Sequence, residues 1–250
     1  MGEQYLPDHR KNPAYLWEGS IFMELYIDDA NVQEIHRLAD LYPIDGVTTN
    51  PSILAKTGRD PIEVLKEIRS IIGREKTIFV QVIPLSSQEI IQDAHAIVKL
   101  MGERTVVKIP SIPEGFKAIR QLKTEDIRTC GTVVYTPLQA CLAAKAGADY
   151  VAPYVNRIDN MGFDGVHVVC RIQDILTNQA METKILAASF KNSQQVLSLC
   201  EYGIKAVTCA PSVIDNFVNN SAIDKAVSDF RQDFFNLTGE NSTMSDLIGG

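Results

Sequence analysis

One short run, Thr105-Val106-Val107-Lys108-Ile109-Pro110, is apolar and β-branched apart from its lysine, which is typical of a strand buried on both faces. Seven comparable runs occur in the chain, at Met23–Asp28, Gly46–Asn50, Thr77–Val82, Arg128–Val134, Tyr150–Pro153, Lys184–Ser189 and Lys205–Thr208. Alternating strands and helices indicate a parallel sheet with helices outside it. Eight such units favour an α/β fold of the closed (β/α)₈ TIM barrel type over an open sheet.

Helix signals fill the segments between these runs. Asp60-Pro61-Ile62-Glu63 offers an N-cap, a first-turn proline and a glutamate at the third position. Ser86–Glu89 and Ser111–Glu114 have the spacing of capping boxes, and Thr136-Pro137 starts a further helix. Gly147 is placed to end that helix. Each predicted helix therefore has a physical reason for where it begins or ends.

Composition narrows the class of protein. The 250 residues, 45% of them hydrophobic, match the usual size of about 250 residues for one such barrel. A net charge of -7 argues against nucleic acid as a partner, and no apolar run is long enough to span a membrane. The start of the chain lacks a signal-peptide pattern, so we expect a cytoplasmic protein. Five scattered cysteines and four histidines give no metal-ligand spacing, and no nucleotide fingerprint occurs, so we expect neither a metal nor a cofactor.

The predicted barrel takes up residues 23–221. Residues 1–22 precede it as an N-terminal extension, which is either poorly ordered or clasped to another subunit. Residues 222–250 form a C-terminal helix and tail, with Val227, Phe230 and Phe234 on one apolar face. That face either packs on its own barrel or reaches a neighbouring subunit.

Polar side chains gather where the predicted strands end, and active sites of barrels lie at the carboxyl ends of their strands. They are Asp28, Thr48, Asn50, Gln81, Lys108, Thr132, Tyr154, Arg157, Ser189 and Lys191. A desolvated lysine is the usual amine nucleophile for forming a Schiff base with a carbonyl substrate, so Lys108 is the candidate catalytic residue. A structural pairing of Lys108 with a carboxylate is the alternative. Ser189 follows the seventh strand, where such barrels often bind phosphate, and Arg157 offers a bidentate clamp.

Several of these residues have other structural explanations, and Thr132 and Tyr154 are compatible with ordinary strand packing. Asp28 is of a residue type that is common at helix N-caps, although Asp29 and Asn31 are also candidates for that role. Asn50, before a proline, is also typical of a turn. Arg157 is two residues from Asp159, a spacing that also suits a surface ion pair of little energy. Lys191 also fits a solvated loop lysine.

Six motifs together resemble one family. They are Met23–Asp28 (MELYID), Gly46–Ile53 (GVTTNPSI), Val106–Pro110 (VVKIP), Gly131–Tyr135 (GTVVY), Tyr150–Asp159 (YVAPYVNRID) and Leu186–Lys191 (LAASFK). In order and spacing they resemble the transaldolase family, most closely its small fructose-6-phosphate aldolase branch, over residues 23–234. The resemblance implies a metal-free class I aldolase that assembles as a homo-oligomer, a decamer, and acts on sugar phosphates.

The resemblance also implies a role for each candidate. Lys108 would form an iminium with fructose 6-phosphate, releasing glyceraldehyde 3-phosphate and then dihydroxyacetone. Asp28 would orient or accept the proton of the C4 hydroxyl. Gln81, Thr132 and Tyr154 would hold a water. Thr48 and Asn50 would bind the donor hydroxyls. Arg157, Ser189 and Lys191 would bind the phosphate.

Two positions bear on the branch. Transaldolases place a glutamate where Gln81 stands and usually a phenylalanine where Tyr154 stands, so the resemblance favours the aldolase. A transaldolase that transfers a dihydroxyacetone unit to an aldose phosphate is the alternative. A barrel that binds sugar phosphates without catalysis is a third hypothesis.

Overall fold

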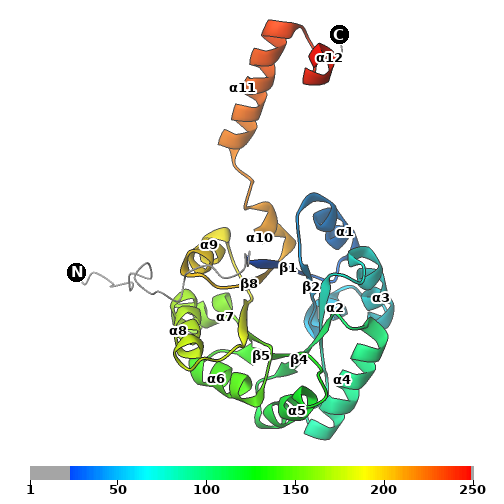
Figure 1. The fold of residues 1–250 in the computed structure, drawn as a ribbon, viewed down its shortest axis with the longest axis vertical. Helices are drawn as coiled ribbons and strands as arrows, with labels where there is room; N and C mark the ends of the chain where they lie inside the picture. Colours follow the sequence, from blue (N-terminus) through cyan, green and yellow to red (C-terminus); the bar gives the residue numbers. More distant parts are fainter. Residues whose placement is uncertain (1–22, 249–250) are drawn as a thin grey trace, which may run out of the picture. The chain divides into compact units, whose positions relative to one another are not determined.

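A computed structural model describes residues 23–248 of the chain. Eight parallel strands close into one barrel in chain order (Figure 1). They are β1 (Glu24–Asp28), β2 (Gly46–Thr48), β3 (Thr77–Gln81), β4 (Thr105–Pro110), β5 (Thr129–Val134), β6 (Tyr150–Pro153), β7 (Lys184–Ala187) and β8 (Ala206–Cys209). Each observed strand overlaps one predicted strand, so the predicted (β/α)₈ barrel is confirmed.

Helices surround this barrel (Figure 1). They are α1 (Val32–Leu41), α2 (Pro51–Lys56), α3 (Pro61–Ile72), α4 (Ser87–Met101), α5 (Pro113–Lys123), α6 (Pro137–Ala146), α7 (Val155–Asp159), α8 (Gly165–Asn178), α9 (Ser193–Tyr202) and α10 (Pro211–Asp215). The chain passes from the carboxyl end of every strand into one or two of these helices. The residues that join a strand to its helix therefore lie at one rim of the barrel.

Side chains fill the barrel interior. Successive residues of a strand point to opposite faces, so every second residue enters the barrel. The interior cluster consists of Tyr26, Phe79, Val106, Cys130, Tyr150, Ala152, Leu186 and Ala206. The Phe79 ring packs edge-on against Tyr26 and Tyr150, with centroids 5.0 and 5.2 Å apart. This plug separates the two ends of the barrel, and the next inward residue at the carboxyl end of most strands is polar.

Three predicted helix starts are confirmed, at Asp60, Ser86 and Thr136, and the last is a complete capping box with Gln139. The Asp60 side chain accepts hydrogen bonds from the N–H groups of Ile62 and Glu63, at 2.8 and 3.0 Å. The Ser86 side chain accepts one from the N–H group of Glu89 at 3.4 Å. These caps satisfy backbone donors that have no partner within the helix.

The predicted capping box at Ser111 is wrong. Helix α5 has Ile112 as its N-cap, without a side-chain hydrogen bond. The N–H group of Ser111 donates to the carbonyl of Thr132 at 2.8 Å, because the pairing of β4 with β5 continues one residue beyond β4. Glu114 instead accepts from the N–H group of Ser87, at the start of α4, at 2.9 Å.

A carboxylate organises the amino-terminal end of the barrel. Glu24 accepts hydrogen bonds from the Lys184 ammonium at 2.6 Å and from the hydroxyls of Tyr26 and Tyr150 at 2.9 and 3.0 Å. Burial raises the pKa of both tyrosines well above the ordinary range. Both hydroxyls therefore stay protonated and act as donors to Glu24.

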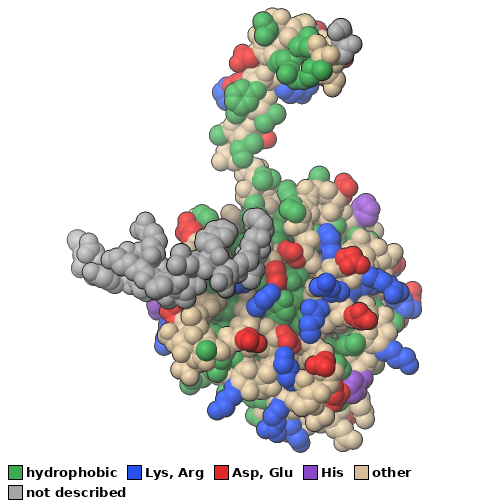
Figure 2. All heavy atoms as spheres, viewed as in Figure 1, with side chains coloured by type: hydrophobic (Ala, Val, Ile, Leu, Met, Phe, Trp, Pro, Cys, Tyr) green, Lys and Arg blue, Asp and Glu red, His purple; other side chains and the backbone are tan. Residues whose placement is uncertain are grey.

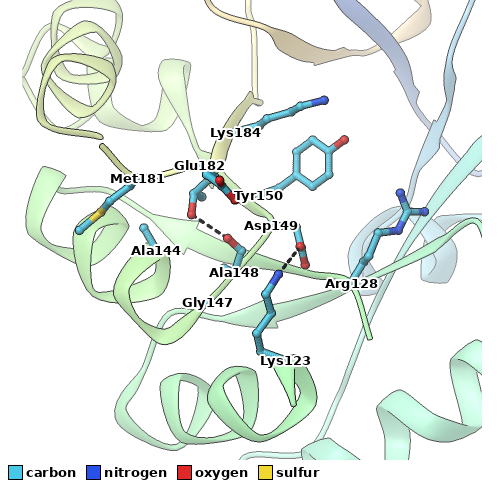
Figure 3. A pocket seen from close by; sticks show the side chains of 11 residues that line it. Lys123, Arg128, Ala144, Gly147, Ala148, Asp149, Tyr150, Met181, Glu182 and Lys184 are labelled. Carbon is cyan, nitrogen blue, oxygen red and sulfur yellow. Dashed lines mark hydrogen bonds and ion pairs between the residues drawn. The ribbon is translucent and has the colours of Figure 1, made fainter. Parts of the chain in front are cut away.

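A cavity of about 430 Å³ opens at this same end, beside the first residues of β5, β6 and β7 (Figure 3). Two of its charged side chains, Lys123 and Asp149, form an ion pair at 2.9 Å. The polar strand-end residues lie at the other end of the barrel. This cavity therefore lies at the end of the barrel opposite the predicted chemistry.

The chain divides into two compact units, and the second starts at Ile214. This unit contains α11 (Ser221–Thr238) and α12 (Met244–Ile248). Figure 2 shows apolar side chains on its surface, and Val227 and Phe230 are 54% and 72% exposed. The predicted boundary at residue 222 stays a prediction, and the predicted extension at 1–22 lies outside the described residues. Within residues 23–248, no helix has both the length and the apolar character needed to cross a bilayer.

Candidate active site

Lys108 lies near the carboxyl end of β4, on the inward face. Its side chain is almost completely buried, with 4% exposure, and Nζ donates to the carbonyl oxygen of Thr49 at 2.8 Å. Strand register places Gln81 on one side of it and Cys130 on the other. Among the described residues Lys108 has no ion pair with a carboxylate, so the alternative of a structural ion pair is not what the structure shows.

The Thr49 carbonyl is itself held in place. The Thr49 side chain and its N–H group both donate to the carbonyl oxygen of Phe79, at 2.9 and 3.0 Å. This double hydrogen bond fixes the peptide unit that receives the Lys108 amine. Sequence reasoning missed this contact, because every residue carries a carbonyl and no residue type marks the one that is used.

Asp28, the last residue of β1, is the carboxylate of the site. Its Oδ1 accepts a hydrogen bond from the Thr48 hydroxyl at 2.8 Å. Burial raises the pKa of Asp28 above its ordinary value, although Lys108 and the hydrogen bond from Thr48 act to lower it. The N-cap of α1 is Asn31, so the helix-cap alternative for Asp28 is wrong.

The Thr48 hydroxyl has a second partner, another hydroxyl, which sequence reasoning missed. Its Oγ1 lies 2.6 Å from Oγ1 of Thr208 in β8, and both side chains are buried. The eighth strand offered a signal, because Thr208 is a polar residue near the end of a buried apolar run, as Thr48 and Thr132 are.

Asn50 is the N-cap of α2. Its Oδ1 accepts from the N–H groups of Ser52 and Ile53 at 3.0 and 3.1 Å. Asn50 therefore caps a helix and does not form the turn given as the alternative. Among the described residues its amide nitrogen has no hydrogen-bond partner, so this group is able to donate to a ligand.

Gln81 ends β3, and its side chain is half-buried next to Lys108 in the strand register. Among the described residues its amide group has no hydrogen-bond partner. A free amide at this place is able to donate to and accept from a water or a substrate hydroxyl.

Thr132 and Tyr154 meet across β5 and β6. Their hydroxyls are 2.9 Å apart, although the residues are 22 positions apart in the chain. The register of β5 shifts between Gly131 and Val134, and Val133 has a φ of +61°. A β-branched residue in the left-handed region is strained, and such strain is typical of functional sites.

Arg157, in the short helix α7, lies over Tyr154. Its guanidinium carbon is 4.7 Å from the ring centroid. A hydrogen bond to the hydroxyl of Tyr135 raises the pKa of Arg157. Tyr135 also packs edge-on against Tyr154, at 5.7 Å between centroids. Sequence reasoning quoted Tyr135 within a motif but missed its place at the site.

The ion-pair alternative for Arg157 is wrong. Asp159 is occupied elsewhere, accepting hydrogen bonds from the N–H group of Gly165 at 2.7 Å and from the side chain of Gln195 at 2.6 Å. The exposed guanidinium of Arg157 therefore remains available to an anionic ligand.

Ser189 and Lys191 follow β7. Ser189 has a φ of +62°, and its carbonyl accepts from the N–H group of Asn156 at 2.8 Å. This contact joins the sixth and seventh loops of the barrel. Lys191 is exposed, and only its backbone is anchored, through a 2.7 Å hydrogen bond from its N–H group to the side chain of Gln195. The alternative of a solvated loop lysine therefore stays open.

The arrangement brings together a buried amine, a carboxylate, hydroxyl and amide groups, and a cation at the rim. Burial raises the pKa of Cys130, behind Lys108, to about 12, so its thiol stays neutral. Between residues 23 and 248, no group of three or more His, Cys, Asp or Glu side chains is arranged to hold a metal ion.

Comparison with known proteins places the chain in a family. A solved structure of a flavocytochrome B2 mutant is similar in fold, with a TM-score of 0.53 and 13% identity. The match covers 76% of this chain and spans 57% of the length of that one, and at this identity it shows the barrel fold alone. The sequence model described as Transaldolase/Fructose-6-phosphate aldolase matches residues 25–247. With most of the barrel and the second unit covered by that match, the chain belongs to the transaldolase/fructose-6-phosphate aldolase family.

Proposed function

We propose that this protein is a class I aldolase that reversibly cleaves fructose 6-phosphate to dihydroxyacetone and glyceraldehyde 3-phosphate. Membership of the family supports an enzyme of the aldolase or transaldolase type. The observation that carries the proposal is the buried Lys108 amine, held at 2.8 Å from a backbone carbonyl at the carboxyl end of the barrel. We further propose that the reaction proceeds through a Schiff base on Lys108 without a metal ion, and that the enzyme is cytoplasmic.

In the proposed reaction the neutral amine of Lys108 attacks the C2 carbonyl of the substrate. Loss of water gives an iminium, which serves as the electron sink. The Asp28 carboxylate takes the proton of the C4 hydroxyl, and the electrons of the C3–C4 bond move to the iminium nitrogen, giving an enamine. Glyceraldehyde 3-phosphate then leaves. Protonation at C3 and addition of water at C2 release dihydroxyacetone and restore Lys108.

Three neutral groups fit the water that these steps consume and release. The hydroxyls of Thr132 and Tyr154 are 2.9 Å apart, and the free amide of Gln81 lies beside Lys108. Such groups are able to position a water for proton transfer. Asn50 and Thr48 are proposed to bind the donor hydroxyls. Arg157 and Ser189, with Lys191, are proposed to bind the phosphate.

The choice of an aldolase over a transaldolase rests on Gln81 and Tyr154. A neutral amide and a phenol are able to position the water that hydrolyses the iminium, which favours release of free dihydroxyacetone. A glutamate is instead able to relay protons during transfer to an aldehyde acceptor. We expect Gln81→Glu combined with Tyr154→Phe to raise the ratio of transfer to cleavage. An unchanged ratio in the double variant would remove this argument.

The test of function uses the purified protein with fructose 6-phosphate alone and then with erythrose 4-phosphate. Steady release of glyceraldehyde 3-phosphate without the acceptor supports the aldolase. Release only with the acceptor identifies the transaldolase. If borohydride fails to trap substrate on Lys108 while the sugar phosphate still binds, the protein is a non-catalytic sugar-phosphate-binding barrel.

We also propose that the chain forms a homo-oligomer, because α11 carries exposed apolar side chains. That the oligomer is a decamer is what the family resemblance implies. Sedimentation velocity of the full chain tests this. A monomer at micromolar concentration would contradict it.

A further inference from the structure

Thr208 is a buried polar residue at the end of the barrel that holds Lys108. It lies in β8 with 2% exposure, and its Oγ1 is 2.6 Å from Oγ1 of Thr48. The register pairs Thr208 with Tyr26, an interior residue, so the Thr208 side chain also points into the barrel. The proposed aldolase reaction gives Thr208 no role.

The direction of the hydrogen bonds follows from the number of protons. A threonine hydroxyl has one proton to donate and accepts through its lone pairs. Thr48 donates its proton to Oδ1 of Asp28, at 2.8 Å. The proton in the contact between the two threonines must then come from Thr208 whenever Asp28 is ionised. The chain of donation therefore runs from Thr208 to Thr48 to Asp28.

We propose that Thr208 is a positioning residue that acts through Thr48 to stabilise the ionised form of Asp28. Hydrogen bonds that end on a charged acceptor are stronger than neutral ones, and consecutive hydrogen bonds in a chain reinforce one another. The stabilised carboxylate is the form able to accept the C4 hydroxyl proton, and this catalytic consequence rests on the proposed function.

Several groups around Asp28 set its ionisation. Lys108 from β4 and Arg157 from α7 favour the carboxylate, whereas the neighbouring Asp29 opposes it. Burial outweighs these charges and raises the pKa of Asp28, and Cys209 is a neutral thiol whose own pKa is raised by burial. With burial against it, the ionised form of Asp28 depends on the Lys108 charge and on the hydrogen bond from Thr48. Loss of the Thr208 hydroxyl therefore raises the pKa of Asp28 further.

The protein offers a matched control. Thr129 in β5 is completely buried, and its hydroxyl has no partner among the described residues. Thr129→Val therefore removes a buried threonine hydroxyl from the same barrel without breaking a hydrogen bond. Any effect of Thr208→Val beyond that of Thr129→Val belongs to the hydrogen-bonded chain.

The experiment measures the titration of Asp28 directly, by NMR of the full-length protein labelled with ¹³C in the aspartate carboxyl groups. The signal that disappears in Asp28→Asn identifies Asp28. We expect Thr208→Val to raise the midpoint by about 0.5 to 1 pH unit, which corresponds to the loss of one hydrogen bond. Thr208→Ser, which keeps the hydroxyl, should restore most of the shift, and Thr129→Val should leave the midpoint in place.

Kinetics provide a second readout. In Thr208→Val, kcat should fall and its acid limb should move to higher pH by the same amount, with KM changed little. Borohydride trapping of substrate on the wild-type protein tests the proposed function separately, because the NMR titration needs no activity. An unmoved Asp28 midpoint in folded Thr208→Val overturns the proposal, as does a shift of equal size in Thr208→Ser. If Thr208→Val fails to fold, Thr208→Ala takes its place with the same expected shift.

Discussion

Glu24→Gln tests whether the two ends of the barrel divide stability from catalysis. Glu24 accepts hydrogen bonds from Lys184, Tyr26 and Tyr150 at the amino-terminal end, behind the interior plug. Glutamine keeps the size and an acceptor oxygen but removes the charge. The expected result is a clear loss of stability with unchanged activity for each folded molecule, because the proposed chemistry takes place at the opposite end.

The expected loss follows from the three contacts. A hydrogen bond to a charged group contributes about 1.5–3 kcal/mol, and a neutral one about 0.5–1.5 kcal/mol, so each contact loses about 1 kcal/mol. The Lys184 side chain is 39% exposed, so solvent screening reduces its share. The total is about 2–3 kcal/mol. For a chain of this size that lowers Tm by about 4–12 °C.

The assay combines thermal unfolding followed by circular dichroism with the rate of cleavage measured well below Tm. Glu67→Gln is the matched control. Among the described residues Glu67 pairs with Arg59 alone, at the surface, where both side chains are more than 40% exposed, so this change should leave Tm close to that of the wild type. A Tm within 2 °C of wild type for Glu24→Gln, or a loss of activity at full stability, would refute the reasoning.

Three further predictions concern the candidate site. Lys108→Met removes the buried amine but keeps the stem, so borohydride trapping should disappear while Tm does not fall; trapping at another lysine would contradict the assignment. Burial raises the pKa of Asp28, so the folded protein favours its neutral form; this contribution to stability is full below the ordinary pKa of about 3.9 and is lost as the pH rises through the raised pKa. Unfolding of Asp28→Asn compared with wild type should therefore show a gain in Tm at neutral pH that shrinks towards pH ~4, and a gain independent of pH would count against it. Val133→Gly relieves a β-branched residue at a φ of +61° and should stabilise the fold by up to about 1 kcal/mol while lowering kcat through a looser Thr132; a lower Tm would show that the strain is not there.

The fold and the ring of strand-end residues were predictable from local patterns. Short apolar runs separated by helix caps identified every strand of the barrel, and the carboxyl-end rule then selected Lys108 and Asp28. The one wrong cap, at Ser111, failed because pairing with the neighbouring strand held that residue in the sheet. A capping pattern reflects only the local preference of the backbone to start a helix. Hydrogen bonds to a neighbouring strand override that preference.

Contacts that depend on barrel closure were not predictable. The Thr48 and Thr208 hydroxyls meet although 160 residues separate them, because β8 pairs with β1 and closes the ring. The Thr49 carbonyl that receives Lys108 carries no signal in its residue type. By itself the sequence determined which side chains stand at the strand ends, since strand periodicity is local. Only the tertiary structure decided which of them touch, because distances across a closed barrel depend on the register of all eight strands together.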